Sequence, residues 1–227
     1  MVLAYNTRSD LGILSSKRLV NVEFPVYEVQ KAKFEAAKKA KDSAKIAKAS
    51  SDLLARWPNR HVKPGETCKV ETLRYGKKPE AAKLAATAQW SSGEEEMRVE
   101  VDVVDASFSI NTKKPSEGSC VSFFFAPSGF DDTRTSWIVI PDGPEDAPII
   151  KSDDGPIKVT WKRTENGYHV AASIPHTSMK GYCKNWTLLP ADVIVNSQNQ
   201  SDTRSLRVGA PGPISKSGRY YVGLVRK

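Results

Sequence analysis

Four short apolar segments in a fixed order most constrain the fold of this chain. They are residues 122–127 (SFFFAP), 136–143 (SWIVIPDG), 166–175 (NGYHVAASIP) and 191–199 (ADVIVNSQN). Each is rich in β-branched or aromatic residues and is closed by Pro, Gly, Asn or Asp, which is typical of successive antiparallel strands and their turns. The sequence therefore predicts an all-β fold, an antiparallel β-sandwich.

Residues 84–90 and 97–104 flank a polar turn and predict a hairpin. In the second strand, Met97, Val99, Val101 and Val103 alternate with charged residues, which predicts a sheet with one buried and one wet face. Residues 67–75 predict one further strand, and residues 219–225 predict the last one.

A change of period near the N-terminus predicts a long α-helix inserted before the sandwich. From about residue 29 to residue 56 the chain is rich in Ala, Lys, Glu and Leu, and Ile46, Ala49, Leu53 and Trp57 recur at helical spacing before Pro58. We expect residues 1–60 to hold N-terminal strands and this basic helix. Residues 61–227 are expected to form the sandwich.

The net charge of +8 is concentrated in this N-terminal part, because residues 1–60 hold 12 of the 34 basic and only 6 of the 26 acidic side chains. The Lys/Ala segment is interpreted as a solvated helix face without the aromatic or Gly-rich elements of a nucleic-acid site. Nothing resembles a membrane span, and residues 1–7 lack the pattern of a secretory signal. We expect neither nucleic acid nor membrane as a partner.

The strand-like start at Val2 favours a piece of a longer, exported chain, and hence a secreted or cell-surface location with neighbouring domains. The cysteines Cys68, Cys120 and Cys183 form no CxxC pair. One disulfide with one free thiol and three free thiols both remain open.

The sequence carries no catalytic signature. Its three histidines have no HxH or HExxH spacing, and it contains no GxSxG elbow, P-loop or dinucleotide fingerprint. The chain is therefore predicted not to be an enzyme.

Two acidic pairs, Asp131–Asp132 and Asp153–Asp154, lie in predicted loops. Neighbouring Asp carboxylates and loop carbonyls suit calcium, which prefers six to eight oxygen ligands. Asp is also common in turns for conformational reasons. These four residues are the candidate ligands of a structural calcium ion.

Sugar recognition needs flat aromatic faces and nearby hydrogen-bonding side chains. Trp186 and Tyr182 lie in a short polar connection, residues 181–187 (GYCKNWT), and Trp90 ends a predicted strand. These three aromatics are the candidate sugar-binding residues, although a Trp in a strand more often packs in the core.

The order and wording of the four apolar segments resemble those of family 9 carbohydrate-binding modules, over about residues 84–227. In that family the corresponding segments read like SVEIFLDP, QFRVNPDG, GYxVExAIPW and FDVQVNDxD. The resemblance implies a sandwich that binds glycans and often holds structural calcium. It places Asn196 where the family has an Asn-Asp pair, which makes Asn196 a fourth candidate sugar-binding residue.

The family's sugar clamp is not matched in this chain. Two tryptophans hold the ligand in sugar-binding members, but the corresponding residues 115–120 and 211–218 contain no aromatic side chain. Ser122 stands in place of the family's Glu, and Ile138 stands in place of its Arg. The fold is therefore expected to be shared, whereas the typical sugar site is not.

These observations favour a non-catalytic, carbohydrate-binding-like module of a polysaccharide-degrading or cell-surface protein. The excess of Lys would suit anionic polysaccharide. One alternative is a purely structural domain that packs on a catalytic neighbour. Another is a haem-binding sandwich, for which Met97, Met179 and His176 would be the axial ligand candidates.

Overall fold

The computed structural model describes residues 60–76, 79–80, 83–126, 134–182, 184, 188–199, 202–210 and 221–225, together with scattered residues between 32 and 48. The chain divides into two compact units, Met1–Leu53 and Leu54–Lys227, and each is described by itself. The larger unit is a sandwich of two sheets.

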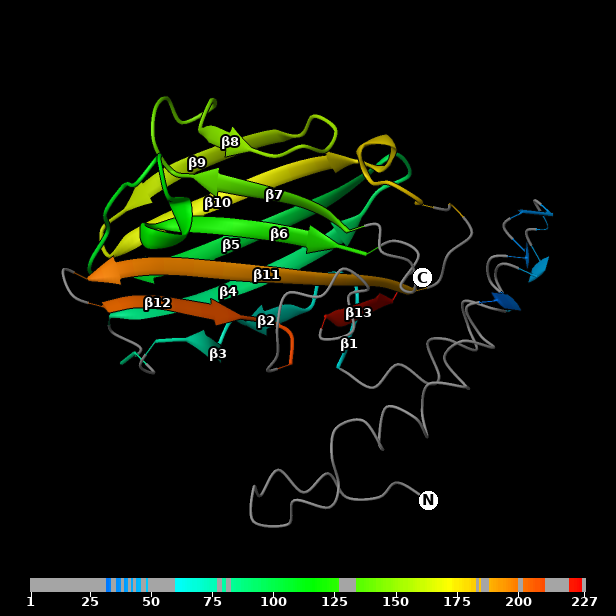
Figure 1. Cartoon of the computed structure of the whole chain (residues 1–227), viewed down its shortest axis with the longest axis horizontal. Helices are drawn as coiled ribbons and strands as arrows, with labels where there is room; N and C mark the ends of the chain where they lie inside the picture. Colours follow the sequence, from blue (N-terminus) through cyan, green and yellow to red (C-terminus); the bar gives the residue numbers. More distant parts are fainter. Residues whose placement is uncertain are drawn as a thin grey trace, which may run out of the picture. The chain divides into compact units, whose positions relative to one another are not determined.

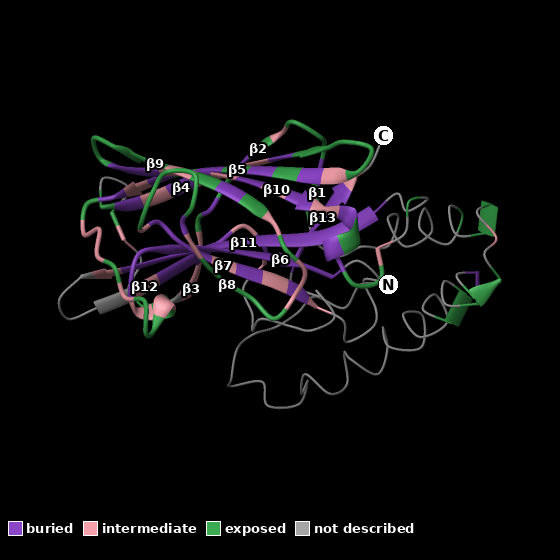
Figure 2. Cartoon of the chain, turned by 90° about the horizontal axis from the view of Figure 1, so that it is seen from above, coloured by how far each residue is buried: buried purple, intermediate pink, exposed green. Residues whose placement is uncertain are grey.

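The first sheet, here called sheet B, has five strands in the order β2-β4-β5-β10-β9. Its strands are β2 (Thr67–Lys69), β4 (Leu84–Ser92), β5 (Glu96–Asp105), β10 (Gly167–Pro175) and β9 (Lys158–Thr164). All of its pairings are antiparallel. Figure 2 shows sheet B as one of two stacked layers of strands.

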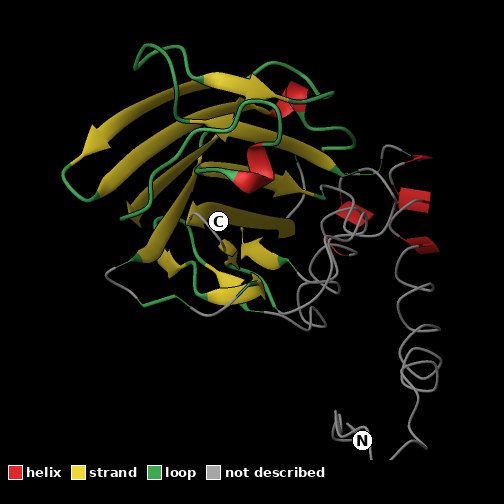
Figure 3. Cartoon of the chain, turned by 60° about the vertical axis from the view of Figure 1, so that its left-hand side comes forward, coloured by secondary structure: helices red, strands yellow, loops and turns green. Residues whose placement is uncertain are grey.

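The second sheet, sheet A, has the strand order β1-β13-β11-β6-β7-β8, with β12 paired to β11 and β3 paired to β12 (Figure 1). Its strands are β1 (His61–Val62), β3 (Thr72–Tyr75), β6 (Cys120–Phe125), β7 (Thr135–Ile140), β8 (Ile149–Lys151), β11 (Leu188–Asn199), β12 (Asp202–Arg207) and β13 (Val222–Val225). Only β1 and β13 pair in parallel among the described strands. Two short 3-10 turns, η2 (Pro115–Glu117) and η3 (His176–Ser178), lie in the connections (Figure 3).

The predicted antiparallel sandwich is confirmed. The four apolar segments correspond to β6, β7, β10 and β11, and the predicted hairpin is β4 with β5. Three strands were not predicted at these positions, namely β1, β8 and β12. Asp202–Arg207 is strongly charged, so hydrophobic patterning alone could not identify it as a strand.

The single strand predicted for residues 67–75 is wrong. The structure has two strands there, β2 in sheet B and β3 in sheet A. Between them, Val70 is buried and its N–H donates to the carbonyl of Ala86, so the chain leaves one sheet and enters the other at Val70–Glu71. The alternation of apolar and polar residues continues through the crossing, so the sequence pattern did not indicate that the chain changes sheets.

The two sheets differ in how they meet solvent. In β5, Met97, Val99, Val101 and Val103 are buried whereas the residues between them are largely exposed, as predicted. Strand β6 is buried at every position, and so is β11 as far as Ser197. Sheet B therefore has one wet face, while the central strands of sheet A are covered on both.

The long N-terminal helix is not seen among the described residues. Ala40 N–H donates to Ala36 O in a helical i to i−4 bond, and Lys45 pairs with Asp42 at 3.1 Å. Most of residues 1–59, including the strands predicted before residue 30, lie outside the described residues. The helix therefore stays a prediction.

Cys68 and Cys120 are buried free thiols, while Cys183 lies outside the described residues. Burial raises the pKa of the Cys120 thiol to about 11, which keeps it protonated and unreactive at neutral pH. Within the described part of the chain, no helix is both long and apolar enough to cross a bilayer.

Candidate functional site

The side of sheet A that faces away from sheet B carries the most unusual set of buried side chains. Strand register defines this outer face. Ser122 of β6 lies beside Ile138 of β7 and Ile194 of β11, and Ile194 lies beside Arg207 of β12. In the adjacent rows, Phe124 pairs with Asp192, and Cys120 pairs with Asn196. The outer face thus combines apolar, polar and charged groups.

These outer-face positions are buried despite their polarity. Ser122 is 4% exposed, Asn196 3%, Asp192 1% and Arg207 0%. A buried polar group costs free energy unless it is hydrogen-bonded, so such a row is uncommon on a face that only packs. On the opposite side of β11, Val193 and Val195 point into the apolar core.

A buried ion pair between neighbouring strands lies at one end of the outer face. Arg207 Nε donates to Asp192 Oδ2 at 2.8 Å, and the Arg207 Nη2 group contacts the same oxygen. The other oxygen, Oδ1, accepts the backbone N–H of Gly209 at 2.9 Å. Both carboxylate oxygens of Asp192 are therefore engaged.

Burial raises the pKa of Asp192 from 3.8 to about 6, and the positive charge of Arg207 opposes this shift without cancelling it. Between pH 3.8 and about pH 6, the Asp192 carboxyl is therefore protonated in the folded state and ionised in the unfolded state. The stability contributed by this proton is fully present below pH 3.8 and is lost as the pH rises through about 6.

We predict that Asp192→Asn removes this pH dependence. Relative to the variant, the parent protein should lose about 2.5 kcal/mol of unfolding free energy between pH 4 and pH 7, because one pKa unit is worth about 1.4 kcal/mol. Urea denaturation at four pH values would measure both curves. Parallel curves would contradict the raised pKa.

An aromatic pair lies beside the ion pair. Phe124 and Tyr221 have ring centroids 6.2 Å apart, and Tyr221 is also 5.9 Å from the guanidinium carbon of Arg207. Together with Ala126 and Ile194 these rings form a buried apolar cluster. At the opposite end of the face, Asn196 Nδ2 donates to the Cys120 sulfur at 3.3 Å. The buried hydroxyl of Ser205 has no hydrogen-bond partner in the described part of the protein.

The candidate sugar-binding residues are not gathered in one place. Asn196 lies on the outer face of sheet A, whereas Trp90 is 2% exposed and belongs to the core side of sheet B. A ring packed in this way offers no face to a sugar. Tyr182 follows η3 and stacks on His176 with ring centroids 4.0 Å apart, so one face of its ring is covered. Trp186 lies outside the described residues.

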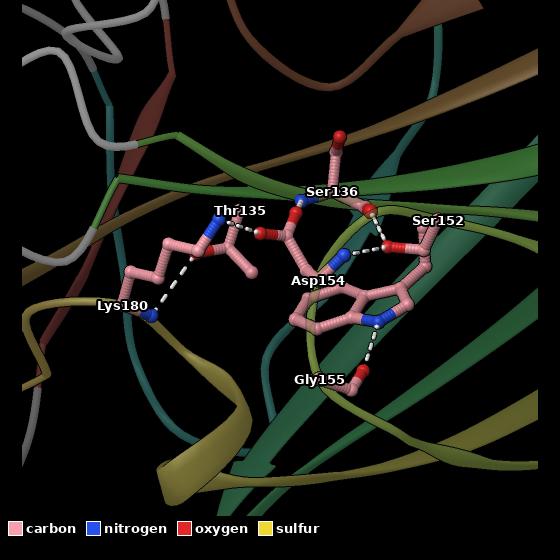
Figure 4. A network of polar contacts seen from close by, with 7 residues as sticks. Thr135, Ser136, Ser152, Asp154, Gly155 and Lys180 are labelled. Atoms are coloured by element: carbon pink, nitrogen blue, oxygen red, sulfur yellow. Dashed lines mark hydrogen bonds and ion pairs between the residues drawn. The ribbon is translucent and has the colours of Figure 1, made fainter.

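Asp154 is part of a hydrogen-bond network that holds the loop after β8 against β7 (Figure 4). Its Oδ2 accepts the Ser136 N–H at 2.7 Å, and its Oδ1 pairs with Lys180 Nζ at 2.9 Å. The Ser152 hydroxyl accepts the N–H of Asp154 at 3.0 Å, and the Lys180 N–H donates to the Thr135 hydroxyl at 3.2 Å. Strand and loop are thereby tied together.

This network does not fit a calcium site at Asp153–Asp154. The Asp154 carboxylate is already paired with the ammonium group of Lys180, which takes the place that a calcium ion would occupy. Asp153 is exposed. The described residues contain no cluster of three or more His, Cys, Asp or Glu side chains able to hold a metal ion. Asp131 and Asp132 lie outside the described residues, so calcium there stays a prediction.

The candidate haem ligands also lie in packed surroundings. Met97 and Met179 are buried, and the His176 ring stacks on Tyr182. Two cavities of about 480 and 500 Å³ are present in the sandwich unit, and none of the three residues lines either of them. The haem hypothesis gains no support from this arrangement.

Sequence reasoning missed Asp192 and Arg207. A signal was present, because each is a charged residue inside an otherwise apolar strand segment, ADVIV and SLRVG. Lys, Glu, Arg and Asp are almost never fully buried unless paired. Two such interruptions in late strands could therefore have suggested a buried pair, though not which strands join it.

Comparison with protein-family models gives no match, and no curated protein matches either. Solved structures do match. A family 9 carbohydrate-binding module from Caldicellulosiruptor kristjanssonii in complex with cellotriose is similar with a TM-score of 0.56 at 14% identity, covering 73% of this chain and 92% of that one. The glucose complex from the same organism gives a TM-score of 0.57 at 13% identity, covering 74% and 96%.

A third structure, a Bacteroides uniformis protein provisionally described as carbohydrate-binding, has a TM-score of 0.53 at 12% identity and is covered over its full length, against 74% of this chain. At such identities the likeness concerns the fold. It agrees with the resemblance seen in the order of the four apolar segments in the sequence. The sandwich of this chain therefore has a family 9 carbohydrate-binding-module-like fold.

Proposed function

We propose that this chain is a non-catalytic glycan-binding module that belongs to a longer polysaccharide-degrading or cell-surface protein. The observation that carries the proposal is the outer face of sheet A. The sequence resemblance aligns three residues of this chain with polar sugar-contacting residues of the family. These residues, Ser122, Ile138 and Asn196, lie together on this one face. The fold shared with sugar-bound modules supports the same conclusion.

The chemistry of the face suits a hydroxyl-rich ligand. Ser136 and Ile138 are partly exposed and lie in the same rows as Phe124 and Ser122, whose side chains are buried, so a hydroxyl and an apolar side chain are the contacts this face offers a ligand. Sugars combine an apolar C–H surface with hydroxyl groups, so they need both kinds of contact. The absence of the family's two clamping tryptophans from the sequence leads us to propose a ligand held by this face in a different way.

The function would be exercised outside the cell, where polysaccharides are found, and on a chain that continues into neighbouring domains. Calcium, if it is bound near Asp131 and Asp132, would have a structural role. Packing of the sandwich on a catalytic neighbour is the competing function. The two functions make opposite predictions for glycan binding.

The test is a screen of the purified chain against neutral and acidic polysaccharides, with and without a calcium chelator. Ile138→Glu places a charge on the outer face at a partly exposed position. Thr160→Glu does the same on the wet face of sheet B and serves as the control. We expect Ile138→Glu to weaken binding roughly tenfold, and Thr160→Glu to leave it unchanged.

Retention of the parent protein on none of the polysaccharides would contradict the proposed function and favour the packing domain. Equal loss of binding in both variants would contradict the assignment to the outer face. Melting curves of the two variants would establish that each is folded. A chelator effect on melting, without an effect on affinity, would support structural calcium.

A further inference from the structure

Arg134 lies on the outer face of sheet A, immediately before β7. Its guanidinium carbon is 5.4 Å from the centroid of the Phe124 ring, which lies in the same row as Ser136 and Asp192. Arg134 itself is partly exposed. It therefore lies at the rim of the buried cluster formed by Phe124, Ala126, Ile194 and Tyr221.

The Nε group of Arg134 is buried and has no hydrogen-bond partner in the part of the chain that the structure describes. A buried donor without an acceptor is costly, and the cost is larger for a charged group. The nearby carboxylate of Asp192 does not fill this role, since Arg207 and the Gly209 N–H occupy its oxygens. Arg134 is thus a charged donor in need of an acceptor.

Several charged groups act on Tyr221 at this end of the face. Burial and the charge of Asp192 raise the pKa of Tyr221 well above its usual value, while the charges of Arg134, Arg207 and Arg74 act in the opposite direction. Arg134 therefore lies close enough to act on the Tyr221 hydroxyl, at the same end of the face as the ion pair between Asp192 and Arg207.

We propose that Arg134 binds the acidic group of an anionic glycan, a carboxylate or a sulfate, with the Phe124 ring as its apolar support. The inference rests on the proposed glycan-binding function and specifies its ligand class. A guanidinium presents a planar set of donors that matches carboxylate and sulfate oxygens in a bidentate geometry. An acidic oxygen would supply the acceptor that Nε lacks.

The experiment compares matched polymers on the same protein. Affinity electrophoresis and calorimetry would use polygalacturonate against its methyl ester, and dextran sulfate against dextran. We expect tighter binding to at least one acidic polymer than to its neutral partner. The first pair reports a carboxylate and the second a sulfate.

The variant is Arg134→Gln, which should weaken binding to the acidic polymer about 10- to 100-fold, as expected for a lost charged hydrogen bond. The matched control is Arg163→Gln. Arg163 also covers a phenylalanine, with its guanidinium carbon 3.7 Å from the Phe108 ring, but it lies on sheet B. Its loss should change affinity by less than about twofold, within the usual range for a remote surface charge. Arg134→Lys, which keeps the charge, provides a second variant if the glutamine variant is unstable, and should bind more weakly than the parent protein.

The outcomes separate the two proposals. Binding to neutral polymers that equals binding to acidic ones, with no effect of either Arg134 variant, would overturn the anionic-ligand inference and leave the glycan-binding function intact. Equal losses in Arg134→Gln and Arg163→Gln would overturn it as well, since a general charge effect would then suffice. Failure of the parent protein to bind any glycan would overturn the glycan-binding function and this inference with it.

Discussion

Replacing Arg207 with methionine is expected to lower the free energy of unfolding by about 3–5 kcal/mol at neutral pH. Arg207 is fully buried and donates to the buried carboxylate of Asp192, which would be left without its cation. The attraction between two buried charges roughly offsets the free energy of removing them from water. Removing one partner leaves the other charge buried and unpaired, so it destabilises the protein far more than replacing both partners does. Chemical denaturation at pH 7.5 would measure the effect.

The double variant Asp192→Asn/Arg207→Met should recover part of this loss, because it leaves no unpaired charge. The loss in Arg207→Met should also be smaller at pH 4.5, where Asp192 takes up a proton. The control is Arg98→Met on the wet face of sheet B. Arg98 pairs with Glu96 at 2.8 Å, but its side chain is 67% exposed. Exposed pairs contribute about 0–1 kcal/mol, so a similar cost at both sites would contradict the role of burial.

Replacing Trp137 with alanine is expected to cost about 3–5 kcal/mol, the usual range for a deleted core tryptophan. The ring is 1% exposed, and it meets Phe125 edge-on with centroids 6.3 Å apart. Its Nε1 group also donates to the carbonyl of Gly155 at 2.8 Å, beside the hydrogen-bond network of Asp154. The substitution would remove packing between the sheets and release the loop after β8.

Trp161 gives a matched comparison for this variant. It makes the same kind of hydrogen bond, from Nε1 to the Pro144 carbonyl at 3.1 Å, but it is only partly buried in β9. Trp137→Ala should cost more than Trp161→Ala, and thermal or urea melts would rank them. The opposite order would mean that Trp137 does not anchor the sandwich.

Hydrophobic patterning predicted the strands that are apolar along their length or that alternate regularly between apolar and charged residues. The runs that became β6, β7, β10 and β11 are apolar enough to be identified individually, and the alternation in β5 assigned its buried face correctly. The charged strand β12 was invisible to the same reasoning because it lacks an apolar run, although it pairs with its chain neighbour β11 in a hairpin.

The candidate site was predicted only in part, for a related reason. Asn196 was found through the resemblance. Its place on the outer face follows only from the strand register, which puts it beside Cys120 and two residues along β11 from Ile194. Arg134, Asp192 and Arg207 come together only when β7, β11 and β12 have been placed in register with β6. Trp90 shows the converse error, since an aromatic at a strand end proved to face the core.

The crossing at Val70–Glu71 has a consequence for how the sandwich opens. The strand β2 is hydrogen-bonded to β4 in one sheet and β3 to β12 in the other, while only two residues join them. Because Val70–Glu71 is such a short connection, we expect fraying of β2 in one sheet to disturb the pairing of β3 in the other. We therefore expect local opening at this side of the domain to be a joint event, in which protection of amide hydrogens in β4 and in β12 rises and falls together.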